Sequence, residues 1–243
     1  MRSIGLRMLD TKKLDFNNIE GTQVAAQKMY IRVDPETGKL IPGGGYGEAV
    51  SPVDGTVWYS SSAAGGPNNK VYMVDPKTDK ITDYPLPASG PGRYPHGIDF
   101  SSDGNVWTSL GSGQLGRLNV KTGEWKFWDN PGLKFKGTGH ETGTTDFPYY
   151  LWVDQFDVSG LGKDTVFVTG TTSDAMFVFD PKKETFSIFH VPYPMPYYAR
   201  GLDGRIDDPN AGWKGRGLWM TYSSYLPRFT ETRSGTVNHM WST

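Results

Sequence analysis

The sequence predicts an all-β fold made of a repeated four-stranded unit. Two recurring patterns indicate this fold, one at turns and one on strands, and the composition agrees with both. The 243 residues include 31 glycines and 17 prolines, and 14% are aromatic. Turn-forming residues and aromatics in this proportion are typical of chains made of short strands. An α/β fold is excluded because no stretch of ten or more residues shows a convincing 3.6-residue hydrophobic period.

The first pattern is a turn of the Asp-Pro-x-Thr-Gly-Lys type that follows an alternating strand. Its four copies read "YIRVDPETGKLI", "VYMVDPKTDKITDY", "LGRLNVKTGEWKFW" and "MFVFDPKKETFSIF", around Asp34, Asp75, Asn119 and Asp180. Proline presets the second turn position, and the Asp or Asn side chain accepts hydrogen bonds from the backbone that follows. Gly38 and Gly123 are expected to adopt the left-handed conformation that ends the turn.

The second pattern is a strand in which a turn residue is followed by a β-branched residue or leucine and then by a large aromatic. It reads "DGTVWYSS", "DGNVWTSL", "KDTVFVTG" and "GRGLWMTY", with the aromatics Trp58, Trp107, Phe167 and Trp219. Because these aromatics recur at equivalent places, we expect them to pack between neighbouring units rather than to bind a ligand.

Together the two patterns define a unit of four strands. A first strand ("GEAVSPV", "PHGIDFS", "YLWVDQF" or "YARGLDG") precedes the aromatic strand, and two more strands flank the Asp turn. A four-stranded unit of about 40–50 residues is typical of one blade of a β-propeller. A β-sandwich is the alternative, because four-stranded meanders also suit that fold.

We interpret residues 1–243 as a single propeller-type domain. Residues 1–24 form a less regular N-terminal segment, and residues 131–148 form an inserted loop. Three full units run from about Gly45 to Pro192, after a pair of strands that ends near Lys39 and before a trailing unit whose third strand is "GTVNHM". Three arrangements stay open: a small closed ring, a piece of a longer propeller, or an open array whose edges pair with another copy of the chain.

Charge and composition exclude several functions. The net charge of −1 gives no electrostatic reason to bind nucleic acid or an anionic membrane. Disulfides and thiolate metal sites are excluded because the chain has no cysteine. No segment is long enough to span a membrane, and "MRSIGLRMLDTKKLDF" lacks the apolar core of a secretory signal. The sequence therefore predicts a soluble chain and leaves its compartment open.

The segment "YPHGIDFSSDGNVWTSLGSGQLGRLNVKTGEWKFW" resembles a blade of the streptogramin B lyase (virginiamycin B lyase) family. That family repeats a Pro-x-Gly-Ile strand, an Asp-Gly-x-Ile/Val-Trp strand, a Gly-Arg-Ile/Leu strand and a Thr-Gly turn. The likeness is best from about Gly45 to Trp128 and is weaker from Tyr149 to Trp219. It implies a propeller that opens the lactone ester of a cyclic depsipeptide by elimination.

The resemblance also implies a mechanism and a site. A histidine removes a proton next to a carbonyl while a magnesium ion polarises that carbonyl. His96, in the Pro-His-Gly-Ile segment, matches the family's base, and the ordinary pKa of histidine suits this task near neutral pH. The acidic metal ligands of the family do not carry over, because Tyr94 stands two residues before the histidine and the following strand ends in Thr108, Ser109, Leu110 and Gly111.

Other residues complete the predicted site at the mouth of the propeller channel. The equivalent strands place Gly47, Tyr150 and Arg200 near the position of His96, and Tyr94, Tyr150, Asp154 and Arg200 are the expected substrate-binding residues. Arg200 is the strongest candidate for binding an anion. The inserted loop could supply His140 and Glu141 as ligands of a divalent metal such as magnesium.

The leading functional hypothesis is a lyase-like propeller that opens the ring of a small or medium organic ligand, such as a cyclic depsipeptide or lactone. His96 would be the catalytic base. Two alternatives stay open: a non-enzymatic module that binds a ligand or a protein, and a metal-assisted lactone hydrolase. The expected partner is a small molecule or a cyclic peptide, together with a second copy of the chain or the remainder of a longer propeller.

Overall fold

Strands dominate the computed structural model, which confirms the all-β prediction. The residues that it describes are 5–34, 36–40, 45–61, 69–89, 93–131, 148–170, 175–190, 197–208, 213–225 and 236–242. Within these ranges, one short α-helix and one 3-10 turn accompany seventeen strands. Every strand pairing between them is antiparallel, and no described pair of strands needs a crossover.

Three complete four-stranded blades form the centre of the chain, each in simple up-and-down order. Blade 1 consists of β3 (Gly45–Val50), β4 (Val57–Ser61), β5 (Lys70–Asp75) and β6 (Lys80–Pro85). Blade 2 consists of β7 (Pro95–Phe100), β8 (Val106–Leu110), β9 (Gln114–Leu118) and β10 (Trp125–Asp129). Blade 3 consists of β11 (Pro148–Asp154), β12 (Thr165–Gly170), β13 (Ala175–Asp180) and β14 (Thr185–His190). These are the three full units that the turn pattern predicted.

Shorter sheets flank the blades. Before them, β1 (Gly5–Leu9) pairs with β2 (Gln27–Ile31), and the connection holds a 3-10 turn (Thr11–Lys13) and α1 (Ile19–Ala26). After them, β15 (Tyr197–Asp208), β16 (Trp213–Tyr225) and β17 (Thr236–Ser242) form a three-stranded sheet. The predicted third strand "GTVNHM" is thereby confirmed, since β17 pairs with β16.

One detail of this last sheet differs from the sequence interpretation. The predicted strand "YARGLDG" ends at Gly204, but β15 continues through Arg205 and Asp208, which pair with residues of β16. This extension was not evident in the sequence because strongly polar residues are rare in buried strands, and a sheet edge tolerates them better.

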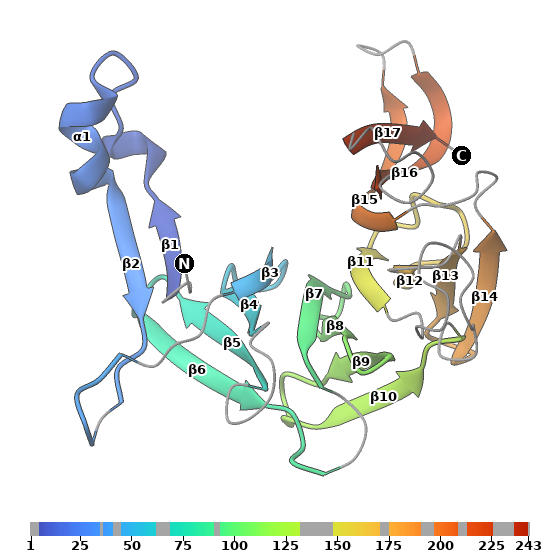
Figure 1. Ribbon diagram of the computed structural model, residues 1–243, viewed down its shortest axis with the longest axis horizontal. Helices are drawn as coiled ribbons and strands as arrows, with labels where there is room; N and C mark the ends of the chain where they lie inside the picture. The colour runs from blue at the N-terminus through green and yellow to red at the C-terminus, as the bar shows by residue number, and fades with distance from the viewer. Residues whose placement is uncertain are drawn as a thin grey trace.

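The blades stand side by side along an open arc (Figure 1). The first strand of each blade lies on the inner side of the arc, so that β3 neighbours β7, β7 neighbours β11, and β11 neighbours β15. The outermost strands β6, β10 and β14 lie on the outer side. Radial blades are the arrangement of a β-propeller and not that of two sheets packed face to face, so the β-sandwich alternative is wrong.

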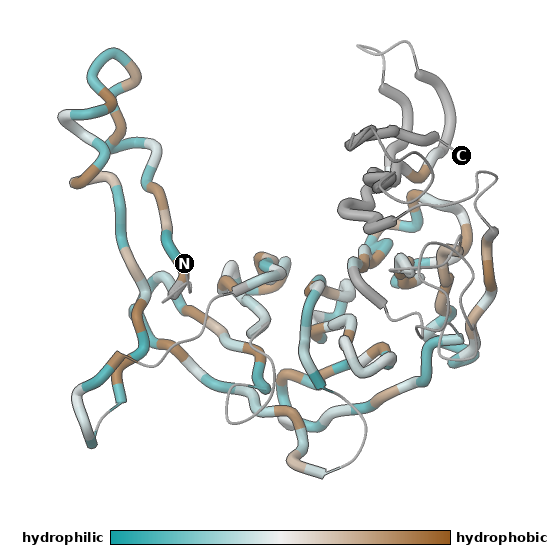
Figure 2. The backbone as a smooth tube through the Cα atoms, viewed as in Figure 1, coloured by the Kyte–Doolittle hydropathy of each residue, from teal (hydrophilic) through white to brown (hydrophobic). Residues whose placement is uncertain are grey.

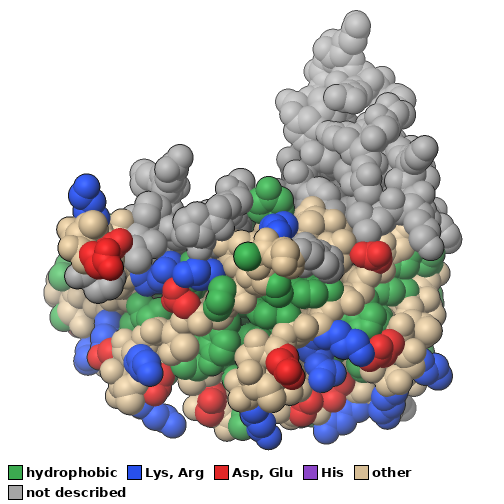
Figure 3. Space-filling view, turned by 90° about the horizontal axis from the view of Figure 1, so that it is seen from below, with side chains coloured by type: hydrophobic (Ala, Val, Ile, Leu, Met, Phe, Trp, Pro, Cys, Tyr) green, Lys and Arg blue, Asp and Glu red, His purple; other side chains and the backbone are tan. Residues whose placement is uncertain are grey.

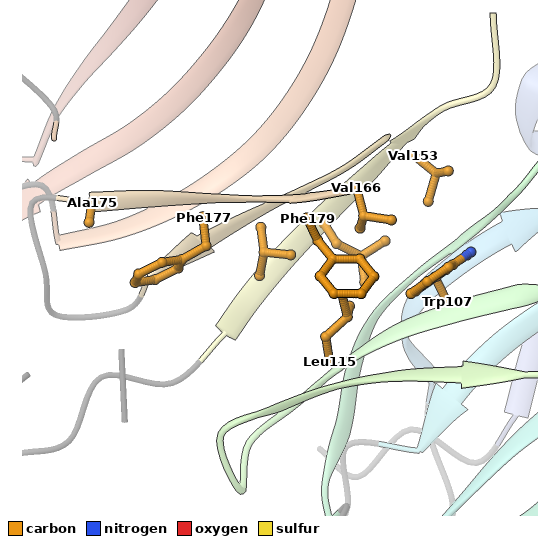
Figure 4. Close-up of a cluster of buried hydrophobic side chains, with 9 residues drawn as sticks. Trp107, Leu115, Val153, Val166, Ala175, Phe177 and Phe179 are labelled. Carbon is orange, nitrogen blue, oxygen red and sulfur yellow. The ribbon is translucent and has the colours of Figure 1, made fainter. Parts of the chain in front are cut away.

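Hydrophobic residues, brown in Figure 2, occur along the strands of the blades. Clusters of their buried side chains fill the spaces between blades. Trp58 of blade 1 packs with Ile98 and Phe100 of blade 2. Trp107 of blade 2 packs against Phe179 of blade 3, in a buried cluster that also contains Phe177 (Figure 4). The prediction that the recurrent aromatics fill these interfaces is therefore confirmed for Trp58 and Trp107.

Phe167 repeats this arrangement one blade further along, where it is buried with Leu218 of β16. The side chain of Trp219, the fourth aromatic of the pattern, lies outside the described residues. Aromatics at one position of the repeat thus hold each described blade to the next.

The turns make the side-chain hydrogen bonds and contain the left-handed glycines that the sequence predicts. Asp75 Oδ1 accepts the backbone N–H of Lys77, and Asn119 Oδ1 accepts the N–H of Lys121 in the next blade. Gly38 and Gly123 have φ angles of 66° and 76°. The hydrogen bonds from Thr78 and Lys77 lower the pKa of Asp75, and those from Lys183 and Lys182 lower the pKa of Asp180.

Acidification is expected to destabilise the fold through these turns. Because folding lowers the pKa of Asp75 and Asp180 below the ordinary value of 3.8, their contribution is present above that pH and is lost as the pH falls through the folded-state pKa. The double variant Asp75→Asn/Asp180→Asn should keep both turns, since asparagine makes the same turn at position 119. Urea unfolding between about pH 5 and about pH 3 should then show a smaller loss of stability for the variant than for the wild type. Equal losses would contradict the assignment.

Acidic and basic side chains alternate on the outer side of the arc (Figure 3). Ion pairs such as Lys28–Asp79 and Lys126–Glu184 join neighbouring sheets there. No helix within the described ranges is both long and apolar enough to cross a membrane.

Candidate functional site

A bulge lies at the start of the first strand of each blade, on the inner side of the arc. We call the region around these bulges, which contains Tyr46, His96 and Tyr150, the mouth of the arc. In β7, Pro95 pairs with Leu110 and Ile98 with Thr108, so His96 and Gly97 together face the single residue Ser109. Blade 1 has the same irregularity between Gly45 and Glu48. A β-bulge re-aims side chains and is frequent beside functional sites.

A hydroxyl on the second strand stabilises each bulge. The backbone N–H of Gly97 donates to Ser109 Oγ at 2.8 Å, that of Gly47 to Ser60 Oγ at 3.0 Å, and that of Tyr150 to Thr169 Oγ1 at 3.1 Å. The bulge therefore depends on a serine or threonine at one position of every complete blade.

Ser60 also links the bulges of two blades. Its hydroxyl accepts from Gly47 and donates to the backbone oxygen of His96 at 2.5 Å. The backbone of blade 1 approaches so closely that a Cβ atom on Gly47 would lie 2.3 Å from the His96 oxygen. Only glycine allows this approach, which holds His96 in place from the neighbouring blade.

The imidazole of His96 lies among tyrosine rings. The Tyr46 ring is 3.8 Å away between centroids and tilted by 38°, and the Tyr150 ring is 6.2 Å away and edge-on. His96 is half-buried, and Tyr46 is 39% exposed. The structure thus brings His96 and Tyr150, two of the predicted residues, into one aromatic cluster with Tyr46.

Tyr94, two residues before His96, has a strained backbone conformation. Its φ angle is 57°, a conformation that a bulky side chain rarely adopts. The Tyr94 N–H donates to Asn69 Oδ1 at 2.9 Å, and its carbonyl accepts the N–H of Gly111 at 3.0 Å. The side chain is 39% exposed. Strain of this kind persists when the surroundings hold it, and it concentrates at functional sites.

The structure refines the strand alignment expected from the sequence. Gly47 and Tyr150 were expected near the position of His96, and the hydrogen bonds to Ser60, Ser109 and Thr169 show that they match its neighbour Gly97. The residue of blade 1 that matches His96 is Tyr46, which the sequence reasoning missed. The signal that could have found it is the dipeptide Tyr46-Gly47, which parallels His96-Gly97.

Asp154 does not join this cluster. It is fully buried at the opposite end of β11, and its two carboxylate oxygens accept the backbone N–H groups of Val158 and Ser159 at 2.7 and 2.8 Å. Its oxygens are occupied by the turn after the strand, so its role is structural rather than substrate binding. The alternation of side chains along a strand does not predict this role, because Asp154 is the last residue of β11 and its side chain serves the turn that follows.

A groove of about 300 Å³ lies between blades 1 and 2, at the end of the strands opposite to His96. Asp54 and Asp103 stand on its rim, but both are bound within their own turns: Asp54 by Thr56, and Asp103 by Ser101 and Asn105. These hydrogen bonds lower the pKa of both carboxyls against the opposing effect of burial. We therefore assign these carboxylates to the turns.

The described surroundings of His96 do not fit a magnesium ion. Magnesium prefers carboxylate and water oxygens, and no group of three His, Asp or Glu side chains able to hold a metal occurs in the part of the chain that the structure describes. The predicted metal ligands His140 and Glu141, and most of the inserted loop, lie outside the described residues, as does the side chain of Arg200.

The chain is a β-propeller protein. Its four-stranded antiparallel blades are set radially, and their first strands line the inner side of the arc. No protein-family model and no curated protein matches the chain.

Solved structures of propellers are nevertheless similar to it. A streptogramin B lyase structure aligns with a TM-score of 0.56 and 13% identity, over 89% of this chain and 59% of that one. A putative gluconolactonase aligns with a TM-score of 0.50 and 16% identity, over 89% and 63%. YCF48, bound to a D1 peptide, aligns with a TM-score of 0.50 and 13% identity, over 81% and 51%.

The resemblance found in the sequence is thus confirmed at the level of the propeller fold. The chain spans about three fifths of the length of the lyase structure. At identities this low, the similarities show the fold alone.

Proposed function

We propose that this propeller binds a small or medium organic ligand at the mouth of the arc and opens its ester ring by elimination, with His96 as the general base. The observation that carries the proposal is the position of His96. It occupies a bulge that two blades hold, and its ring lies 3.8 Å from the Tyr46 ring. The fold similarity to a streptogramin B lyase supports the same reaction class.

The tyrosines account for ligand binding in this proposal. Tyr46 and Tyr94 are each 39% exposed, and Tyr150 is half-buried beside His96. Aromatic faces bind apolar rings and chains of a cyclic depsipeptide or lactone, while their hydroxyls hydrogen-bond to amide and ester groups. Such a surface orients a neutral ligand without a charged partner.

The reaction requires only one base in its proton-transfer step. An imidazole nitrogen of His96 takes the proton from the carbon next to the carbonyl, and the electrons of that C–H bond form a carbon–carbon double bond. The adjacent carbon–oxygen bond breaks, and the ester oxygen leaves as part of a carboxylate. The ring opens without water entering the product.

Replacing His96 with alanine is expected to lower the rate of ring opening by about 10²–10⁴-fold, because that is the usual contribution of a general base. Product formation from cyclic depsipeptides and from simple lactones is measured by mass spectrometry. An elimination product keeps the mass of the substrate, whereas hydrolysis adds one water. His190→Ala, on the outermost strand β14, is the matched control and should leave the rate unchanged.

An unchanged rate in His96→Ala would overturn the catalytic assignment. A product heavier by one water would instead identify a lactone hydrolase. We also propose that His140 and Glu141 are donors to a magnesium ion. Magnesium titration should therefore show weaker binding by His140→Ala than by the wild type, and equal binding by the two proteins would refute these donors.

A non-enzymatic binding module is the second candidate function. It is favoured by the composition of the mouth, where the rings of Tyr46 and Tyr150 lie beside the single histidine. This function predicts that the wild type binds the cyclic ligand without changing it and that Tyr46→Ala weakens binding. Turnover by the wild type would exclude it.

A further inference from the structure

A row of polar side chains crosses blade 1 on the face that the β1–β2 hairpin covers. Tyr59 on β4 is in register with Tyr72 on β5, which is in register with Asp83 on β6. Cross-strand partners share one face of a sheet. The two tyrosine rings are stacked, with centroids 4.9 Å apart and planes 30° apart.

The hairpin closes over this row. Tyr30 of β2 is buried with Tyr59 and Tyr72 in one apolar cluster, and Leu6 and Met8 of β1 pack against it. The apolar contacts account for how the hairpin attaches to the blade, but the polar ends of the same side chains lie within the covered region.

Arg32, just after β2, brings a positive charge to the row. Its guanidinium carbon lies 4.2 Å from the centre of the Tyr72 ring, and its Nη2 donates to Asp83 Oδ2 at 3.1 Å. Lys70 Nζ also lies 3.0 Å from Asp83 Oδ2. Two cations therefore share one carboxylate. Glu48, the next residue of the row on β3, is exposed to water.

Three buried polar atoms in this cluster lack a hydrogen-bond partner of normal geometry among the described residues: Arg32 Nη1, Tyr59 Oη and Tyr72 Oη. Arg32 and Ser61 nevertheless lie close enough to the Tyr72 hydroxyl to act on its pKa, so the Tyr59 hydroxyl is the donor with the least compensation. Both tyrosines are 0% exposed, and the Arg32 side chain is 10% exposed. Burial raises the pKa of Tyr72, and that of Tyr59 to about 12, against the opposing effect of the Arg32 charge. Both phenols are thus protonated donors at neutral pH, and unpaired buried donors are costly.

We propose that Arg32, Tyr59 and Tyr72 bind a compact monoanion, a small carboxylate or a halide, between the β1–β2 hairpin and blade 1. The guanidinium presents five donors in a fixed fork, so Nη2 can hold Asp83 while Nη1 meets the anion. The two phenols complete a set of three donors. The anion balances the second cation of the Arg32–Lys70–Asp83 group and joins the hairpin to the blade.

Thermal unfolding of the full chain tests the site. Sodium formate, sodium chloride and sodium nitrate are compared at equal ionic strength with sodium gluconate, whose anion is too large for a buried site. A compact anion should raise the unfolding midpoint with saturation, by about 5 °C at one hundred times the dissociation constant. The order of the three salts distinguishes a carboxylate site from a halide site. Isothermal titration with the most effective anion should show one site per chain.

The variants Tyr59→Phe and Arg32→Gln should abolish the dependence on the anion. Tyr84→Phe is the matched control, because it makes the same change in the same blade but is in register with Val71 rather than with the polar row. It should keep the full response.

Two outcomes would overturn the proposal. If Tyr59→Phe raises the midpoint equally in every salt, the hydroxyl is an unfilled buried donor. If it lowers the midpoint equally in every salt and the wild type shows no anion response, a buried water fills the cluster instead.

Discussion

Replacing Trp107 with alanine is expected to lower the free energy of unfolding by about 3–5 kcal/mol. The indole is 1% exposed between blades 2 and 3, and its centroid lies 5.4 Å from that of Trp128 and 5.7 Å from that of Phe179. Truncation leaves a cavity between two sheets. Each sheet is held rigid by its own hydrogen bonds, so the blades cannot close the gap fully. Equilibrium unfolding in urea, followed by circular dichroism, measures the change.

Phe156→Ala provides the control for the loss of an aromatic ring. Phe156 is 82% exposed, and its removal should change the free energy of unfolding by no more than about 0.5 kcal/mol. A loss below about 1 kcal/mol for Trp107→Ala would mean that the interface between blades 2 and 3 is not packed in solution as Figure 4 shows.

Replacing Gly47 with alanine is expected to cost about 1–3 kcal/mol of stability and to disturb the candidate site at the same time. The new Cβ would lie 2.3 Å from the His96 oxygen and 2.9 Å from the Ile98 nitrogen. Both are backbone atoms, so the overlap can be relieved only by moving β3 away from β7. That movement separates Tyr46 from His96 and weakens ligand binding in the proposed function.

Gly38→Ala separates this effect from the conformational preference of glycine. Gly38 has a φ angle of 66° and no atom within 4 Å of an added Cβ, so only the strain of about 1–2 kcal/mol remains and the mouth is unaffected. Urea unfolding gives the stability of both variants, and ligand titration reports the site. Undiminished ligand binding by Gly47→Ala would contradict the proposed coupling between the blade contact and the mouth.

Much of the fold is predictable from the sequence because its signals are local. Asp75 and Asn119 identify turns through hydrogen bonds to residues two positions away, and Gly38 and Gly123 end such turns by their backbone freedom. Trp58 and Trp107 repeat at one place in the blade, which predicts an interface even though the partner is unknown.

The candidate site is less predictable. His96 could be identified because the other blades have no histidine at that place in the repeat. Tyr46, which lies beside His96 in space, was missed because a bulge shifts the strand register by one residue. Asp154 was misplaced for a related reason: alternation ends where the strand ends, and the carboxylate then serves the following turn.

The sequence by itself determined the blade, since period-two strands and turn chemistry act over a few residues. Only the tertiary structure decided which blades meet and what lies between them. Tyr46 reaches His96 across 50 residues of chain, and Arg32 reaches Asp83 across 51. Contacts of this kind depend on how two separately formed sheets pack together. No local pattern encodes them, and both the proposed mouth and the proposed anion site are built from such contacts.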